Sequence, residues 1–269
     1  MREVMRKAGA IFVRDARIAF AYPLAFWTGL AGVAAQPLSF YFLSKIVGAS
    51  GAFGFNGSSI SYFEYVAVNL AFLRFQSAAM IGFQRAVRGE QMMGTIESVL
   101  VTPTGISLLI TSSGLFPFAL TFVQIALFIG VSLALGLDLS HTNVLTTLAF
   151  ALLTMLAMSP IGIFAAASIM SFKQELPTGA LVGGLATLLG GVLFPVSKLP
   201  PLLQQLAWFF PITHSLNGIR AAVAGASLAQ TGDDALWLAV VALILFPLSL
   251  YAFARSVRRA KIDGTLGEY

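Results

Sequence analysis

The chain has 269 residues, of which 58% are hydrophobic and 10% charged, and its mean hydropathy is +0.87. Soluble domains carry roughly 25% charged residues, so this composition excludes an ordinary water-soluble enzyme. The lack of cysteine excludes disulfides and thiolate metal sites, and two histidines are too few for a histidine-based metal cluster. The net charge of +5 comes from basic residues that flank apolar stretches, which favours a membrane protein over a nucleic-acid-binding protein.

The first 21 residues are basic and amphipathic. Their apolar residues recur at helical spacing: Val4, Met5, Ala8, Ile11 and Phe12. Arg14, Asp15 and Arg17 interrupt the apolar stretch that a cleavable signal peptide needs. We therefore expect residues 1–21 to form an interfacial helix on the cytoplasmic surface of the membrane. A basic leader without such a helix is the alternative.

Six apolar segments are long enough to cross a bilayer, which takes about 20 residues. They lie near 22–45, 62–85, 111–136, 144–170, 176–194 and 235–254. Most Lys and Arg residues precede the first segment, follow the last, or lie in the second-to-third and fourth-to-fifth links, so both termini are expected in the cytoplasm. The predicted fold is an all-α membrane protein, with an interfacial helix (1–21), a six-helix transmembrane domain (22–254) and a basic cytoplasmic tail (255–269).

One arginine interrupts the second apolar segment near its middle. Arg74 is about 18 Å along a helix from Tyr62, at 1.5 Å per residue, and a cation at that depth must be paired or hydrated. We expect Arg74 either to face a substrate pathway, where it meets an anionic group, or to clamp neighbouring polar groups such as Gln36 or Gln124.

The segment that follows, 85–103, reads as an amphipathic cytoplasmic helix that Pro103 ends. Farther along, 199–219 lacks charge but contains Pro200, Pro201 and Pro211. These prolines argue against a seventh crossing. We expect an outer re-entrant or interfacial hairpin there, between spans 5 and 6.

Two motifs stand out along the chain. The first is Glu90, then Gly94-Thr95-x-Glu97-x-x-Leu100-x-Thr102-Pro103. The second is Gly190-Gly-Val-Leu-Phe-Pro195 and Leu199-Pro200, followed by a run from Phe210-Pro211 to Arg220. Both motifs resemble those of type-2 ATP-binding-cassette (ABC) exporter permeases. In that family the first stretch forms a coupling helix that docks on the ATPase, and the second caps the external mouth.

The resemblance implies roles for individual residues. Those expected to couple the chain to the ATPase are Glu90, Met93, Gly94, Thr95, Glu97, Leu100, Thr102 and Pro103. Those expected at the outer gate are Pro195, Pro200, Pro211 and Arg220.

The predicted function is that of a permease subunit of an ATP-driven exporter of an amphiphile, in the bacterial cytoplasmic membrane. No Gly-x-x-x-x-Gly-Lys-Ser/Thr motif is present, so two copies of a separate ATPase would bind the ATP and magnesium. No cofactor, metal or catalytic residue is expected in this chain. The other expected partners are a second permease copy, as a homodimer or with a paralogue, and membrane lipid, with no nucleic acid. The alternatives are an ion-coupled transporter or channel, and a lipid-modifying membrane enzyme.

Overall fold

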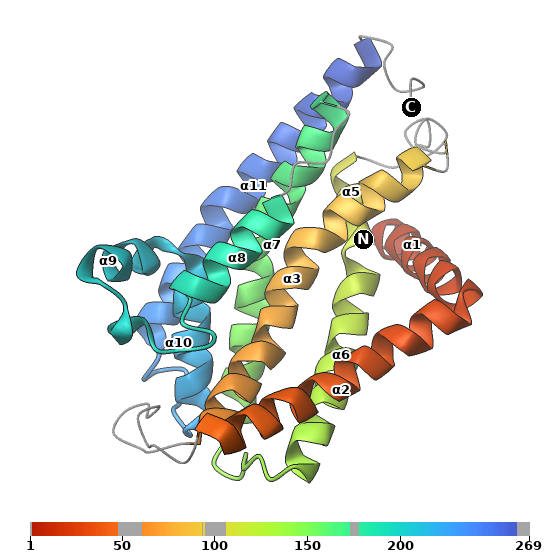
Figure 1. Ribbon diagram of the computed structural model, residues 1–269. Coiled ribbons are helices and arrows are strands. Elements are labelled where there is room, and N and C mark those ends of the chain that lie inside the picture. The colour runs from red at the N-terminus through yellow and green to blue at the C-terminus, as the bar shows by residue number, and fades with distance from the viewer. Residues whose placement is uncertain (1, 48–60, 93, 95–105, 173–177, 263–269) are drawn as a thin grey trace.

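The computed structural model describes residues 2–47, 61–92, 94, 106–172 and 178–262, and the regular secondary structure of these residues is entirely helical (Figure 1). The predicted all-α class is thereby confirmed. In chain order, the helices are α1 (Arg2–Ala21), α2 (Pro23–Val47), α3 (Tyr62–Met92), α5 (Ile106–Ser113), α6 (Leu115–Ala134), α7 (Val144–Phe172), α8 (Thr178–Leu189), the 3-10 turn η1 (Val196–Lys198), α9 (Pro201–Phe209), α10 (Pro211–Val223) and α11 (Gly232–Ile262).

Four helical stretches of the described chain are long and apolar enough to cross a membrane: Tyr62–Met92, Leu108–Ala134, Val144–Met170 and Gly232–Ile262. A fifth crossing is possible by length and composition if α1 and α2, which meet at a bend of 90°, count as one span. Within the fifth predicted segment, 176–194, α8 has 12 residues and is about 18 Å long at 1.5 Å per residue. The six-span count therefore stays a prediction.

Local sequence explains where several helices begin. Ser61 and Glu64 form a capping box at the start of α3: the Ser61 amide donates to the Glu64 carboxylate at 2.8 Å, and the Glu64 amide donates to the Ser61 hydroxyl at 3.2 Å. Pro201 and Pro211 occupy the first positions of α9 and α10, where a missing amide costs nothing. These prolines thus begin two short helices of 9 and 13 residues, each shorter than the about 20 residues that a crossing takes.

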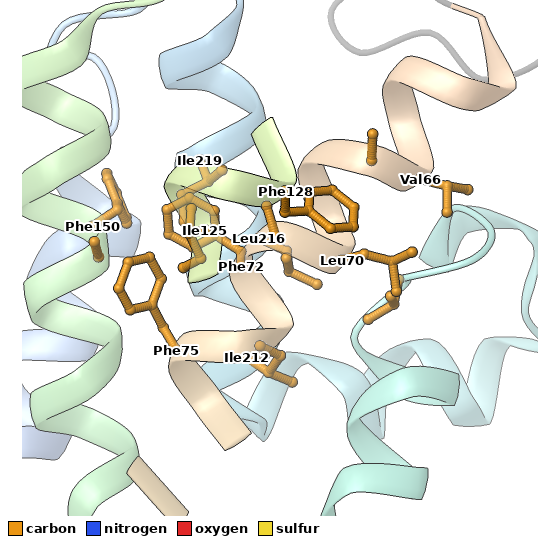
Figure 2. Packing of buried hydrophobic residues seen from close by; sticks show 14 of the residues in the cluster. Val66, Leu70, Phe72, Phe75, Ile125, Phe128, Phe150, Ile212, Leu216 and Ile219 are labelled. Carbon is orange, nitrogen blue, oxygen red and sulfur yellow. The ribbon is translucent and has the colours of Figure 1, made fainter. Parts of the chain in front are cut away.

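The centre of the bundle is built around α3 and α7. α7 packs along both α3 and α11, and α6 and α10 pack on α3 as well. Figure 2 shows side chains from α3, α6, α7 and α10 meeting in one apolar cluster, which includes Leu70, Phe75, Phe128, Phe150 and Leu216. α1 lies beside α5, away from this cluster, and has no buried residue (Figure 1).

Gly162 allows the close approach of α7 to α3. A Cβ atom at this position would lie 2.3 Å from the carbonyl oxygen of Ala79 and 2.7 Å from that of Met80. Backbone atoms of a packed helix cannot yield as a flexible side chain can, so any residue larger than glycine would force the two helices apart.

We predict that Gly162→Ala destabilises the purified protein by about 1–3 kcal/mol, the usual cost of overpacking a core, and lowers its midpoint of thermal unfolding. Gly130→Ala on α6 is the matched control, because its new Cβ would have no contact within 4 Å. Equal midpoints for Gly162→Ala and the unsubstituted protein would show that α3 and α7 do not pack as described.

Candidate functional site

Three polar clusters lie at successive levels along α3, which runs the length of the bundle (Figure 1). Following the orientation predicted from the sequence, we name them the outer cluster, around Tyr65 and Asn69; the groove, around Arg74; and the inner cluster, around Glu90. Each cluster joins α3 to a segment distant in sequence, so a single helix contacts all three.

The outer cluster is organised by Arg220 of α10. Its Nε donates to Oδ1 of Asn69 at 2.9 Å, and its Nη2 donates to the carbonyl oxygen of Gly191 at 2.5 Å. The Tyr65 hydroxyl donates to the same Gly191 carbonyl at 2.6 Å, and Asn69 Nδ2 donates to the Val192 carbonyl at 2.9 Å. The Arg220 guanidinium also lies over the Tyr65 ring, 4.9 Å from its centroid. Together these contacts tie α3 and α10 to the turn after α8.

Two glycines make this arrangement sterically possible. Gly191 has a φ of +70°, a left-handed conformation that other L-residues adopt only with strain, and its turn presents two successive carbonyls to α3 and α10. Gly218 lets α10 lie against α7, because a Cβ there would come within 2.0 Å of the Phe150 ring. Arg220 is thereby held in a buried position.

Of the four predicted outer-gate residues, Arg220 alone makes a polar side-chain contact in the outer cluster. The prolines shape the surrounding chain: Pro195 and Pro200 precede η1 and α9, and Pro211 starts α10. Sequence analysis missed Tyr65 and Asn69, and it included Gly191 in the second motif without giving it a role. Tyr65 and Asn69 are four residues apart on one helix face, so a polar pair at helical spacing within an apolar segment was the available signal.

His214 belongs to a separate aromatic cluster beside the outer cluster. Its Nδ1 lies 2.6 Å from Oδ1 of Asp234 and its Nε2 lies 2.8 Å from the Trp208 carbonyl oxygen. The imidazole ring packs against Trp208 and Trp237, with centroid distances of 5.6 Å and 5.4 Å. These contacts join α9, α10 and α11. Among the described residues, no group of three or more His, Asp or Glu side chains is placed to hold a metal ion.

Arg74 lies at the middle level, where it lines a groove of about 690 Å³ between α1, α2, α3, α5 and α6. It donates from Nη2 to Oε1 of Gln36 on α2, which is one of the two clamp partners anticipated from sequence; Gln124, the other, lines the same groove. The guanidinium also lies 5.5 Å from the Phe128 ring centroid. Arg74 Nε is buried and makes no hydrogen bond within the described part of the chain. A centrally placed arginine costs at least about 2.5–3.5 kcal/mol in a membrane, and the Gln36 amide oxygen accepts from one of the several N–H donors of this guanidinium.

The inner cluster joins α1 to the last turn of α3. Arg14 Nη1 lies 2.6 Å from Oε1 of Glu90, and Arg14 Nη2 lies 2.8 Å from Oδ1 of Asp15. Burial raises the pKa of Asp15, and its bond to Arg14 acts in the opposite direction. Sequence analysis assigned Glu90 to coupling with the ATPase and gave it no intramolecular partner; in the structure its carboxylate binds Arg14 of α1, the predicted interfacial helix.

Much of the predicted coupling segment lies outside the described residues, including Met93, Thr95, Glu97, Leu100, Thr102 and Pro103. Within the described part, residues 85–92 continue α3 and do not start a new helix. Gly94 has a φ of +65° and its amide donates to the Gln91 carbonyl at 3.0 Å, a helix-ending conformation that favours glycine. Gly94 thus ends α3, and the predicted coupling residues that follow it lie outside the described residues.

Comparison with known proteins assigns the chain to a family. The family model described as ABC-2 type transporter matches residues 12–223, which include α3, the outer cluster, the groove and the inner cluster. Among curated proteins, none matches the sequence at a significant level. The match extends over most of the chain and agrees with the family that both sequence motifs resemble. The chain therefore belongs to the ABC-2 type transporter family and is a transmembrane, non-catalytic permease subunit of such a transporter.

Proposed function

We propose that this permease works as a homodimer, or as a heterodimer with a paralogue, with two copies of a separate ATPase, and exports an amphiphile across the bacterial cytoplasmic membrane. Six spans, cytoplasmic termini, an interfacial α1 and an outer hairpin built from η1, α9 and α10 complete the proposed arrangement. ATP and magnesium bind only the ATPase in this account. Uncharged, aromatic helices favour an amphiphilic drug, lipid or lipid-linked saccharide as the substrate.

The observation that carries the proposal is the position of α3. Its inner end leads directly through Gly94 into the predicted coupling segment, and its outer end binds the turn that Arg220 holds. Under this proposal, a push on residues 95–103 acts on a centrally packed helix that is the least hydrophobic of the candidate spans. This continuity is what a permease driven by an external motor requires.

The alternative of an ion-coupled transporter or channel has less support. Such proteins usually carry several carboxylates inside their spans, whereas Glu64 caps the first turn of α3 and Glu90 binds Arg14 near the last turn. A lipid-modifying enzyme needs clustered acid–base or metal-binding groups, and the described residues hold no metal-binding cluster.

The proposal predicts that Glu97→Lys abolishes association with the ATPase and transport, while the permease still folds. Loss of a buried, hydrogen-bonded charge typically costs about 2–5 kcal/mol, which weakens binding roughly 30-fold or more. The measurement is a pull-down of tagged permease co-expressed with the ABC ATPases of its own genome, alongside size-exclusion chromatography. Asp233→Lys, the same charge reversal at the start of α11, should bind normally. Wild-type ATPase binding and transport in Glu97→Lys would overturn the coupling assignment.

The outer-gate role of Arg220 predicts that Arg220→Lys loosens the contact between α10 and the turn at Gly191. An ammonium cannot reproduce the guanidinium geometry, and an unsatisfied buried acceptor costs about 1–3 kcal/mol, so local opening should rise roughly tenfold. In a chain without cysteine, Ser215→Cys places a unique, buried thiol on α10. Its reaction rate with a maleimide should rise when Arg220→Lys is added. The exposed Arg255→Lys is the control, and an unchanged rate would contradict the gate assignment.

A further inference from the structure

The groove between α1, α2, α3, α5 and α6 has a charged face on α3. Arg74, Ala78, Ile81 and Arg85 line it at successive helical spacings, because a helix returns to nearly the same direction after 11 residues. Arg74 and Arg85 are therefore separated along the axis by about 16 Å, at 1.5 Å per residue. Arg85 lies toward the inner end of α3, and Arg74 lies deep in the bundle.

The acidic side chains that line the groove bond to a third arginine, Arg14, and the three arginines and two carboxylates leave the lining with a net positive charge. The two carboxylates are those of Asp15 and Glu90. Within the described part of the chain, no carboxylate lies within ion-pair distance of Arg74 or Arg85. Arg74 also keeps a buried Nε with no hydrogen-bond partner among these residues. A partly buried guanidinium with an unused, buried Nε donor favours a ligand with a carboxylate or phosphate group.

The rest of the lining suits a ligand that is only partly polar. Ser77, Thr121 and Gln124 provide further hydrogen-bonding groups around Arg74. The remaining lining is largely apolar and includes Ile18, Leu73, Phe116 and Leu120. The volume, about 690 Å³, is within the range of roughly 300–1,000 Å³ found for small-molecule sites. A head group fits inside, and an acyl chain would remain against the apolar helices.

We propose that this groove binds one anionic amphiphile taken from the inner leaflet, which enters past Arg85 and places its acidic group on Arg74. Entry from the inner leaflet rests on the proposed function, which places both termini, and therefore the Arg85 end of α3, on the cytoplasmic side. Arg74 then binds a ligand in addition to clamping Gln36, and the transported amphiphile belongs to the anionic class. The competing occupant is a segment of the second permease copy, which would make the groove a dimer interface.

Native mass spectrometry of the purified full chain in neutral detergent tests the proposal, because it reports bound lipid and oligomeric state together. The probe is phosphatidylglycerol, and zwitterionic phosphatidylcholine is the comparison lipid. We expect saturation at one phosphatidylglycerol per chain, with phosphatidylcholine bound much more weakly. Arg74→Gln should weaken phosphatidylglycerol binding by about tenfold or more, because it removes a charge-assisted contact.

Three further variants distinguish lipid binding in the groove from general effects of net charge or misfolding. Arg74→Lys keeps the charge and should retain much of the affinity. Ser77→Trp leaves both arginines in place and should reduce binding by filling the groove. Arg258→Gln removes one exposed positive charge on α11, outside the groove, and should bind as the unsubstituted protein does.

Equal affinity for the two lipids, or unchanged affinity in Arg74→Gln, would overturn the site. Loss of the dimer in Arg74→Gln and Ser77→Trp, without a change in bound lipid, would overturn it in favour of a subunit interface. The assay needs neither the ATPase nor a membrane orientation. Its failure would therefore leave the exporter proposal standing, and failure of the Glu97 experiment would leave this site standing.

Discussion

The organisation of this permease follows from one constraint: α3 carries polar and charged groups through the membrane and must be shielded from lipid. Asn69, Gln76 and Gln84 are buried along its length, with Arg74 partly buried among them. Such groups are expensive in hydrocarbon unless they find partners. The apolar helices therefore surround α3, and Gly162 removes the side chain that would keep α7 from its backbone. The bundle is assembled around its least hydrophobic spanning helix.

This central position gives α3 contact with every functional level of the protein. Its outer end binds the turn that Arg220 and Gly191 form, its middle faces the groove, and its inner end binds α1 and leads toward the coupling segment. α3 contains no proline, whereas α2, α7 and α11 contain Pro37, Pro160 and Pro247. A continuous helix without a proline is the stiffest available connection between the two ends of the bundle.

Sequence patterns predicted elements well where the signal is local and continuous. Long uncharged segments located α6, α7 and α11, and an apolar segment interrupted by a few charges, among them Arg74, located α3. The fifth predicted span, 176–194, extends beyond helix α8, because apolar composition does not show where a helix ends. α8 ends at Leu189, ahead of Gly191 with its left-handed backbone conformation. Residues 85–92 were predicted as part of a separate amphipathic helix, because helical periodicity does not reveal that they continue the preceding helix.

Sites that depend on distant contacts lay beyond sequence reasoning. Arg220 and Asn69 are 151 residues apart and meet only because α10 packs across α3. Glu90 was identified from a motif, but its bond to Arg14 needed the fold to bring the inner end of α3 beside α1. Arg74 was found because a cation in an apolar segment is conspicuous alone, and its partner Gln36 was among the polar groups considered.

The central claim is that α3 transmits motion from the ATPase side to the outer cluster as one rigid body. Pulsed electron paramagnetic resonance tests this in the reconstituted transporter, with spin-label pairs on introduced cysteines at partly exposed Tyr62 and at exposed Met92 and Leu236. On addition of a non-hydrolysable ATP analogue, the Tyr62–Met92 distance along α3 should stay constant, while both distances to Leu236 on α11 change together. A change at Met92 that does not reach Tyr62 would show that α3 bends, and would contradict the account.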